Sequence, residues 1–204
     1  MKRTAAVSTV LLAVVAATTL AAAAEPSSPV PTAKTEEDTA REYFSDLMLT
    51  TMQGESVRFY SDVLKDRVVL INSFYTSSDG ITPRQGQILT KLQGMLGDSL
   101  GRDFFIVSIT IDPENDTPEK IREFAQGLGA GPGWIFLTGP PENVLEVNRR
   151  LGQQPEHIDD HKGLYLLGNV ATTLWVKLPV HAVPSDLNRQ LQRLLVDKGE
   201  PGDD

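Results

Sequence analysis

A polar segment at Tyr75–Pro83 carries two hydroxyl side chains, Ser78 and Thr82, four residues apart. A serine acts as a nucleophile when a base lies beside it and a third group orients that base. The spacing between Ser78 and the histidines of the chain does not suggest such a triad. The segment also lacks the G-x-S-x-G turn of many hydrolases. We interpret both residues as structural, with Thr82 capping a helix that begins at Pro83, and a serine hydrolase as the weaker alternative.

A second group of candidate residues lies near position 160, where His157 and His161 flank two aspartates. Imidazole with carboxylate is a borderline ligand set for Zn(II) or Cu(II). In a helix both histidines would share one face, but Pro155 and Gly163 bracket the segment and indicate a loop. Two readings stay open: a solvated acidic loop, or a weak divalent-metal site at His161 with His157 or a nearby aspartate.

Cysteine is absent from all 204 residues. The chain therefore makes no disulfide, offers no thiolate to a metal and cannot exchange thiols with a partner. Cysteine usage gives no information about the redox compartment.

Strands and helices are predicted to alternate along the chain. Two apolar, β-branched runs, Val68–Tyr75 and Phe104–Ile111, are typical of strands buried on both faces. The other predicted strands are Leu47–Met52, Ser56–Tyr60, Trp134–Leu137, Leu164–Leu167 and Thr172–Lys177, with hairpin turns at Gly54 and at Gly168-Asn169. Helices follow from Thr82 to Leu96, from Thr117-Pro118, after Leu137 and from about Ser185.

Each predicted helix carries apolar residues at three-and-four spacing, which marks its inward face. These stripes include Met95, Leu145 and Leu195. The alternation predicts an α/β protein with a thioredoxin-like fold: a mixed central sheet, helices on both faces and an N-terminal hairpin.

Several blocks between about Phe44 and Leu178 resemble the Sco/SenC family of copper-site assembly proteins. The blocks are Tyr75–Pro83, Val107–Glu119, Trp134–Gly139, Asp160-His161 and Tyr165–Leu167. The resemblance places Ser78 and Thr82 at the family's two cysteine positions and His161 at its histidine copper ligand. Because hydroxyls lack the softness and charge of thiolates, the alignment implies a member without the copper and redox site, and no tightly bound copper or other cofactor.

The ends of the chain have compositions that differ from the middle. Residues 1–24 combine Lys2 and Arg3 with a long apolar stretch and an A-x-A pattern, which predicts a cleaved signal peptide; a membrane anchor is the alternative. Residues 25–40 are predicted as a flexible linker, 41–197 as the single domain and 198–204 as a disordered tail.

The chain is acidic, with 27 acidic and 19 basic residues and a net charge of −8. This balance argues against a nucleic-acid partner and against an anionic membrane surface. The expected function is that of an exported, periplasmic, non-catalytic accessory factor. The resemblance implies a protein partner in respiratory copper or haem protein assembly, such as an oxidase subunit or an exported cytochrome. Membrane attachment is expected only if residues 1–24 stay uncleaved.

Overall fold

The first of the two apolar runs forms β3, Val68–Phe74, and all seven of its residues are buried. Successive side chains point to opposite faces of the sheet, so Leu70 and Phe74 join one core cluster while Val69 and Ile71 join the other. The computed structural model describes residues 35–160 and 163–199. The predicted signal peptide, most of the predicted linker, His161 and residues 200–204 lie outside the described residues.

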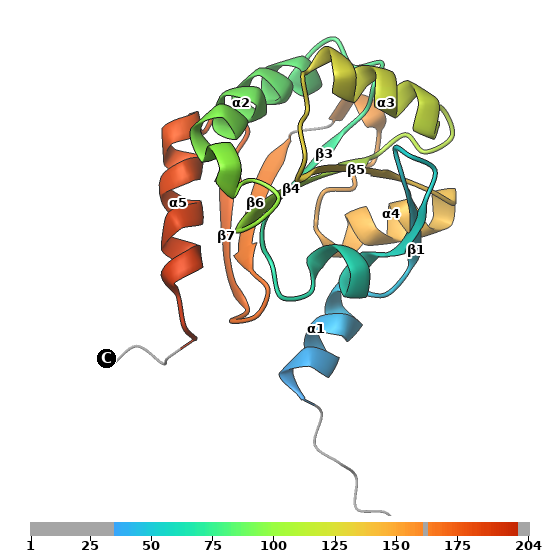
Figure 1. The fold of residues 1–204 in the computed structure, drawn as a ribbon. Coiled ribbons are helices and arrows are strands. Elements are labelled where there is room, and N and C mark those ends of the chain that lie inside the picture. Colours follow the sequence, from blue (N-terminus) through green and yellow to red (C-terminus); the bar gives the residue numbers. More distant parts are fainter. Residues whose placement is uncertain (1–34, 161–162, 200–204) are drawn as a thin grey trace, which may run out of the picture. The chain divides into compact units, whose positions relative to one another are not determined.

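Seven strands form one mixed sheet in the order β2-β1-β5-β4-β3-β6-β7 (Figure 1). The central strands β3, β4 and β5 are parallel, whereas β6 pairs with β3, β7 with β6, and β1 with β5 and β2 in antiparallel fashion. The remaining strands are β1 Met48–Thr51, β2 Ser56–Arg58, β4 Phe104–Thr110, β5 Trp134–Thr138, β6 Leu164–Asn169 and β7 Leu174–Pro179.

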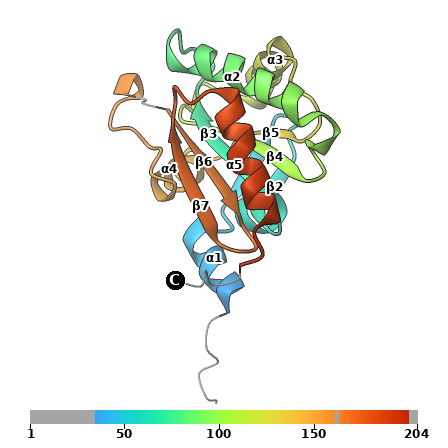
Figure 2. The ribbon, with the colours of Figure 1, turned by 90° about the vertical axis from the view of Figure 1, so that its left-hand side faces the viewer.

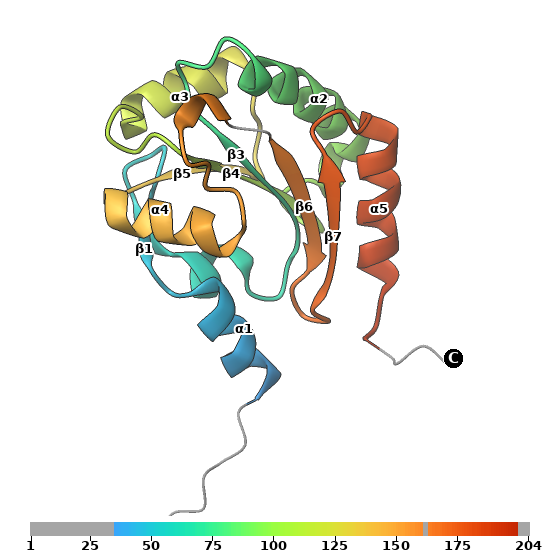
Figure 3. The ribbon, with the colours of Figure 1, turned by 180° about the vertical axis from the view of Figure 1, so that it is seen from behind.

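Helices cover both faces of the sheet, and this confirms the predicted fold class (Figures 2 and 3). The helices are α1 Glu36–Phe44, α2 Ile81–Leu96, α3 Pro118–Gly127, α4 Pro141–Arg150 and α5 Pro184–Val196. One core cluster joins α2, α3 and α5 to the sheet. The other joins α1, α4 and a short π-helix, Phe59–Leu64, to the opposite face. Burying each large apolar side chain contributes about 1.5–3 kcal/mol, so the two clusters hold the three layers together.

The first helix begins inside the segment predicted as a linker, 25–40. Thr35 accepts a hydrogen bond from the backbone of Asp38, and the Asp38 side chain accepts one from the backbone of Thr35, which makes a capping box. Ala40 and Phe44, one turn apart, are both buried in the core. Ordered structure therefore starts before residue 41, because two buried apolar side chains at helical spacing and a capping box outweigh a polar local composition.

The second hairpin turn lies later than the predicted Gly168-Asn169. Both residues belong to β6, and pairing continues to Asn169 opposite Leu174. The Asn169 side chain donates to the Leu194 carbonyl at 2.9 Å, which holds it against α5. Thr173 takes the positive backbone φ of 58° that the turn requires.

Three residues assigned to inward stripes are instead on the surface. Met95, Leu145 and Leu195 are exposed by 50%, 38% and 39%. The strand predicted over Ser56–Tyr60 ends at Arg58, where the π-helix begins and buries Phe59 and Tyr60. The width of each helix's buried face depends on which elements pack against it, and the spacing of apolar residues within the helix gives no information about those elements.

Candidate functional site

The loop after β3, residues 75–80, presents the two hydroxyl residues differently. Ser78 is partly exposed, and its backbone N–H donates to the Tyr75 carbonyl at 3.3 Å. Within the described residues its hydroxyl is hydrogen-bonded to no histidine or carboxylate. Thr82 is only 2% exposed, and its Oγ1 accepts a hydrogen bond from the Tyr75 N–H at 3.3 Å. Among the residues that the structure describes, Ser78 thus has no base that would make it a nucleophile, and the Thr82 hydroxyl is occupied by the backbone.

Thr82 is not the helix cap that the sequence predicts. The helix α2 begins at Ile81, Gly80 stands at the capping position, and no side chain caps the first turn. The Thr82 hydroxyl instead closes the loop back onto the end of β3. The residue is structural, as expected, but through a different hydrogen bond.

A buried carboxyl, Asp116, joins this loop to the one that follows β4. Its Oδ1 accepts from the Thr76 hydroxyl at 2.5 Å, its Oδ2 accepts from the Thr110 hydroxyl at 2.5 Å, and the Thr76 N–H donates to both oxygens at 3.2 Å. Asp116 has no exposed surface. Burial raises the pKa of the Asp116 carboxyl, and the hydrogen bonds from Thr110 and Thr76 oppose this effect.

The carboxyl ends of parallel β3 and β4 are adjacent, which is why two loops far apart in sequence share one carboxyl group. We call residues 75–80 and 111–117 the carboxyl-end loops. Sequence reasoning gave Asp116 no role. Little in the sequence pointed to it, because Asp116 follows both of its threonine partners, Thr76 and Thr110, by 40 and 6 residues.

An acidic cleft of about 620 Å³ adjoins the carboxyl-end loops. Its acidic lining residues are Asp79, Asp112, Glu114 and Glu156, and no lysine or arginine is among the described residues that line it. Clustered negative charge of this kind attracts basic groups and repels anions. The site can therefore recognise a basic protein surface better than a phosphate or carboxylate.

The predicted metal ligands are only partly placed. His157 is exposed, and its carbonyl accepts from the Asp160 N–H at 2.9 Å in the short 3-10 turn Ile158–Asp160. His161 lies outside the described residues. Among the residues the structure describes, no three histidine or carboxylate side chains are grouped as a metal site.

Ser78 and Thr82 do not fit a thiolate-type copper centre. Their donor atoms are neutral oxygens, and the one on Thr82 is buried and already accepts a backbone hydrogen bond. Copper(I) prefers soft thiolate and thioether ligands. These two side chains therefore offer that ion neither charge nor softness.

A buried polar group lies behind the loop and was also missed. Both amide atoms of Gln85 and the Tyr165 hydroxyl are buried without a hydrogen-bond partner. Burial raises the pKa of Tyr165, so its phenol stays protonated. A Cβ on Gly163, the residue before β6, would approach the Gln85 amide nitrogen to 3.1 Å, which shows how closely the start of this strand packs on α2.

Comparison with known families and structures gives one consistent result. The SCO1/SenC family model matches residues 35–178. A SCO1 protein homolog of Bacillus subtilis is 33% identical over 94 residues, 46% of this chain and 47% of that protein. A SCO2-like protein of Rickettsia conorii is 31% identical over 130 residues, 63% of this chain and 61% of that protein. The chain thus spans about half to three fifths of the length of these curated relatives.

Solved structures show the same fold at low identity. The structure of BsSco, described as a member of the Sco family of cytochrome c oxidase assembly proteins, superposes with a TM-score of 0.64 at 22% identity, covering 76% of this chain and 94% of that one. The structure of copper-bound ScoI of Arabidopsis thaliana superposes with a TM-score of 0.61 at 21% identity, covering 73% of this chain and 95% of that one.

Proposed function

Because the chain belongs to the SCO1/SenC family, we propose that it is a non-catalytic accessory factor that binds a protein partner during assembly of a respiratory copper or haem protein. One observation supports the proposal: the segment Tyr75–Pro83, which the resemblance aligns with the family's two cysteine positions, is tied to its surroundings by hydrogen bonds of Thr76 and Thr82. We propose that the fold is kept to present a binding surface, while the chemistry of sulfur is absent. Thiol exchange has no cysteine to support it. Among the described residues, no histidine or carboxylate is hydrogen-bonded to Ser78 as a serine mechanism would need.

The proposed recognition surface comprises Thr76–Pro83, the neighbourhood of His161 and the acidic cleft. Its charge indicates a partner with a basic docking face, such as a respiratory oxidase subunit or an exported cytochrome. The description of BsSco as belonging to a cytochrome c oxidase assembly family supports this choice of partner. We also propose that residues 1–24 direct export to the periplasm, with anchoring by the uncleaved segment as the alternative. No helix within the described residues is long and apolar enough to span a membrane.

Binding to the exported domain of a respiratory oxidase subunit, measured by biolayer interferometry, tests the proposal. We expect saturable binding that weakens with salt, and about tenfold weaker binding by the double variant Asp79→Asn, Glu156→Gln. The matched control is Asp98→Asn, Glu123→Gln, which removes two exposed acids outside the cleft. Absence of binding, together with unchanged oxidase and cytochrome levels after deletion of the gene, would contradict it.

We further propose that no metal is held tightly. Titration of the purified chain with Cu(II) and Zn(II) tests the alternative of a weak site at His161 with His157. We expect affinities weaker than about 10 µM that change less than about threefold in His161→Ala, because isolated surface imidazoles bind these ions weakly. Micromolar binding that disappears in this variant would establish the metal site instead.

A further inference from the structure

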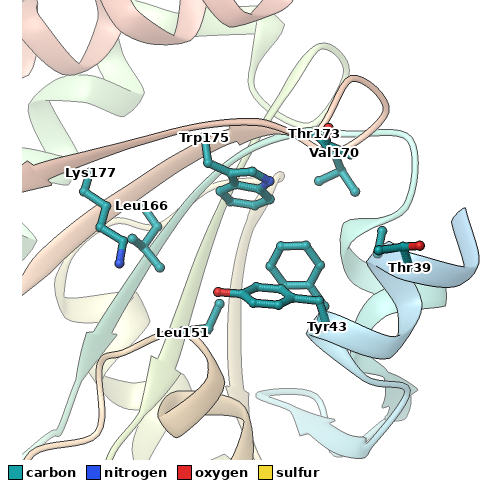
Figure 4. A pocket seen from close by; sticks show the side chains of 10 residues that line it. Thr39, Tyr43, Leu151, Leu166, Val170, Thr173, Trp175 and Lys177 are labelled. Carbon is teal, nitrogen blue, oxygen red and sulfur yellow. The ribbon is translucent and has the colours of Figure 1, made fainter. Parts of the chain in front are cut away.

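A second concave region lies on the α1 face of the sheet, away from the carboxyl-end loops. This pocket has a volume of about 460 Å³ and is lined by residues of α1, β6, β7 and the end of α4. Pockets that take small ligands commonly measure about 300–1,000 Å³. We call it the aromatic pocket, because Tyr43, Phe44 and Trp175 form much of its wall (Figure 4).

The rings of the aromatic pocket are packed against one another. The Phe44 ring centroid lies 5.0 Å from that of Trp175 and 4.9 Å from that of Tyr43. Figure 4 shows the Trp175 indole on one side of the space and the Tyr43 ring on the other. Leu151, Leu166 and Val170 complete the apolar lining.

The Trp175 side of the pocket depends on a glycine in the neighbouring strand. Gly168 stands directly opposite Trp175 in the β6–β7 pairing. A Cβ at position 168 would come within 2.4 Å of the indole ring, so the ring lies flat across β6 only because that residue has no side chain.

The α1 side is held in place by hydrogen bonds from α4. The Arg150 guanidinium donates to the carbonyls of Glu42 and Tyr43 at 2.6 and 3.2 Å, and the Tyr43 hydroxyl donates to the Arg150 carbonyl at 3.3 Å. Glu146 holds Arg150 in turn at 2.7 Å. These bonds satisfy the last carbonyls of α1, so the pocket is formed before any ligand arrives.

Lys177 gives the pocket its charge. It alone is charged among the described residues that line the pocket, and none of the ion pairs found within the described part of the chain involves it. In Figure 4 its side chain lies beside Leu166 at one end of the space. An unpaired ammonium group beside an apolar wall complements an anion that carries a hydrocarbon body.

We propose that the aromatic pocket binds a small amphipathic carboxylate, with the hydrocarbon portion between Trp175 and Tyr43 and the carboxylate beside Lys177. The apolar contacts supply most of the affinity, and the ion pair selects acids over neutral molecules of the same length. This site is independent of the partner-binding surface proposed for the carboxyl-end loops.

Decanoate and 1-decanol are suitable probes, because they differ only in the charged group. Isothermal titration calorimetry on the full chain gives the affinity, and tryptophan fluorescence reports the location. The other tryptophan, Trp134, is 3% exposed and bonded to Ser108, so a ligand-dependent change is expected from Trp175. We expect saturable binding of decanoate that is tighter than that of decanol.

Two variants decide between this site and adventitious binding elsewhere. Lys177→Gln is expected to weaken decanoate binding about fivefold and to leave decanol within twofold, whereas Lys91→Gln, at an exposed lysine of α2, changes neither. Ala40→Phe fills the pocket from α1 and should abolish both. If Ala40→Phe does not fold, as circular dichroism would reveal, Lys177→Gln still carries the test. No decanoate binding, or binding that is unchanged in Lys177→Gln, would overturn the proposal.

Discussion

The carboxyl-end loops are fixed by hydrogen bonds, whereas the aromatic pocket is enclosed by packed rings. In the loops, the Asp116 carboxyl and the hydroxyls of Thr76, Thr82 and Thr110 are all used in internal bonds. In the pocket, the Lys177 side chain is exposed and Trp175 is partly exposed. The loops therefore offer a fixed, acidic surface to a partner, whereas the pocket offers an apolar wall and a cation to a small ligand.

The largest effect is expected from returning sulfur to the loop. The double variant Ser78→Cys, Thr82→Cys should bind Cu(I) at least about a hundredfold more tightly than the natural chain, because thiolates are soft, charged ligands. Competition with bicinchoninate measures this affinity. The matched control, Ser77→Cys, Thr82→Cys, has as many thiols at altered spacing. Equal affinity in both variants, or tight Cu(I) binding by the natural chain, would show that the loop geometry is not the determinant.

Removing the carboxyl that joins the two loops should have the next largest effect. Asp116→Ala leaves the buried Thr110 hydroxyl and the half-buried Thr76 hydroxyl and N–H without their acceptor, which we expect to cost about 3 kcal/mol of unfolding free energy. Urea denaturation measures the loss, and the exposed Asp98→Ala serves as the control. A loss below about 1 kcal/mol would mean that the loops are held by packing, as the pocket is.

The corresponding change in the pocket is Gly168→Ala. Its Cβ would displace the Trp175 ring, so we expect a loss of about 1–2 kcal/mol in stability together with weakened decanoate binding. Gly94→Ala, in α2 with open space around the added Cβ, is the control and should stabilise by up to about 1 kcal/mol. Unchanged Trp175 fluorescence in Gly168→Ala would show that the ring tolerates the methyl group.

The smallest effect is a dependence on pH. The folded pKa of Asp116 lies above its ordinary value of 3.8, so below pH 3.8 the carboxyl is protonated in both the folded and unfolded states. As pH rises from 3.8 through the raised pKa, the unfolded state loses the proton first, and the contribution of this group to stability falls. The unfolding free energy of the natural chain, relative to that of Asp116→Asn, should therefore decline over this range. A difference that rises with pH would indicate that the hydrogen bonds outweigh burial.

The sequence predicted correctly those strands and helix starts that depend only on residues adjacent in the chain. The continuous apolar runs at β3 and β4 are buried strands, and Thr117 caps α3 by accepting from the Lys120 N–H, as Thr117-Pro118 indicates. The predicted cap at Thr82 was wrong, because its hydroxyl is taken by Tyr75, seven residues earlier. The role of Asp116 was not predicted either, because its partner Thr76 lies 40 residues earlier in the sequence.

The sequence by itself determined which donor atoms exist. With no cysteine anywhere, thiolate and disulfide chemistry are excluded whatever the fold. Only the tertiary structure decided which of the remaining groups are used internally, because adjacent strands bring Asp116 to Thr76 and set Gly168 beneath Trp175. Composition is a property of single residues, whereas the availability of a group depends on neighbours that the chain acquires on folding.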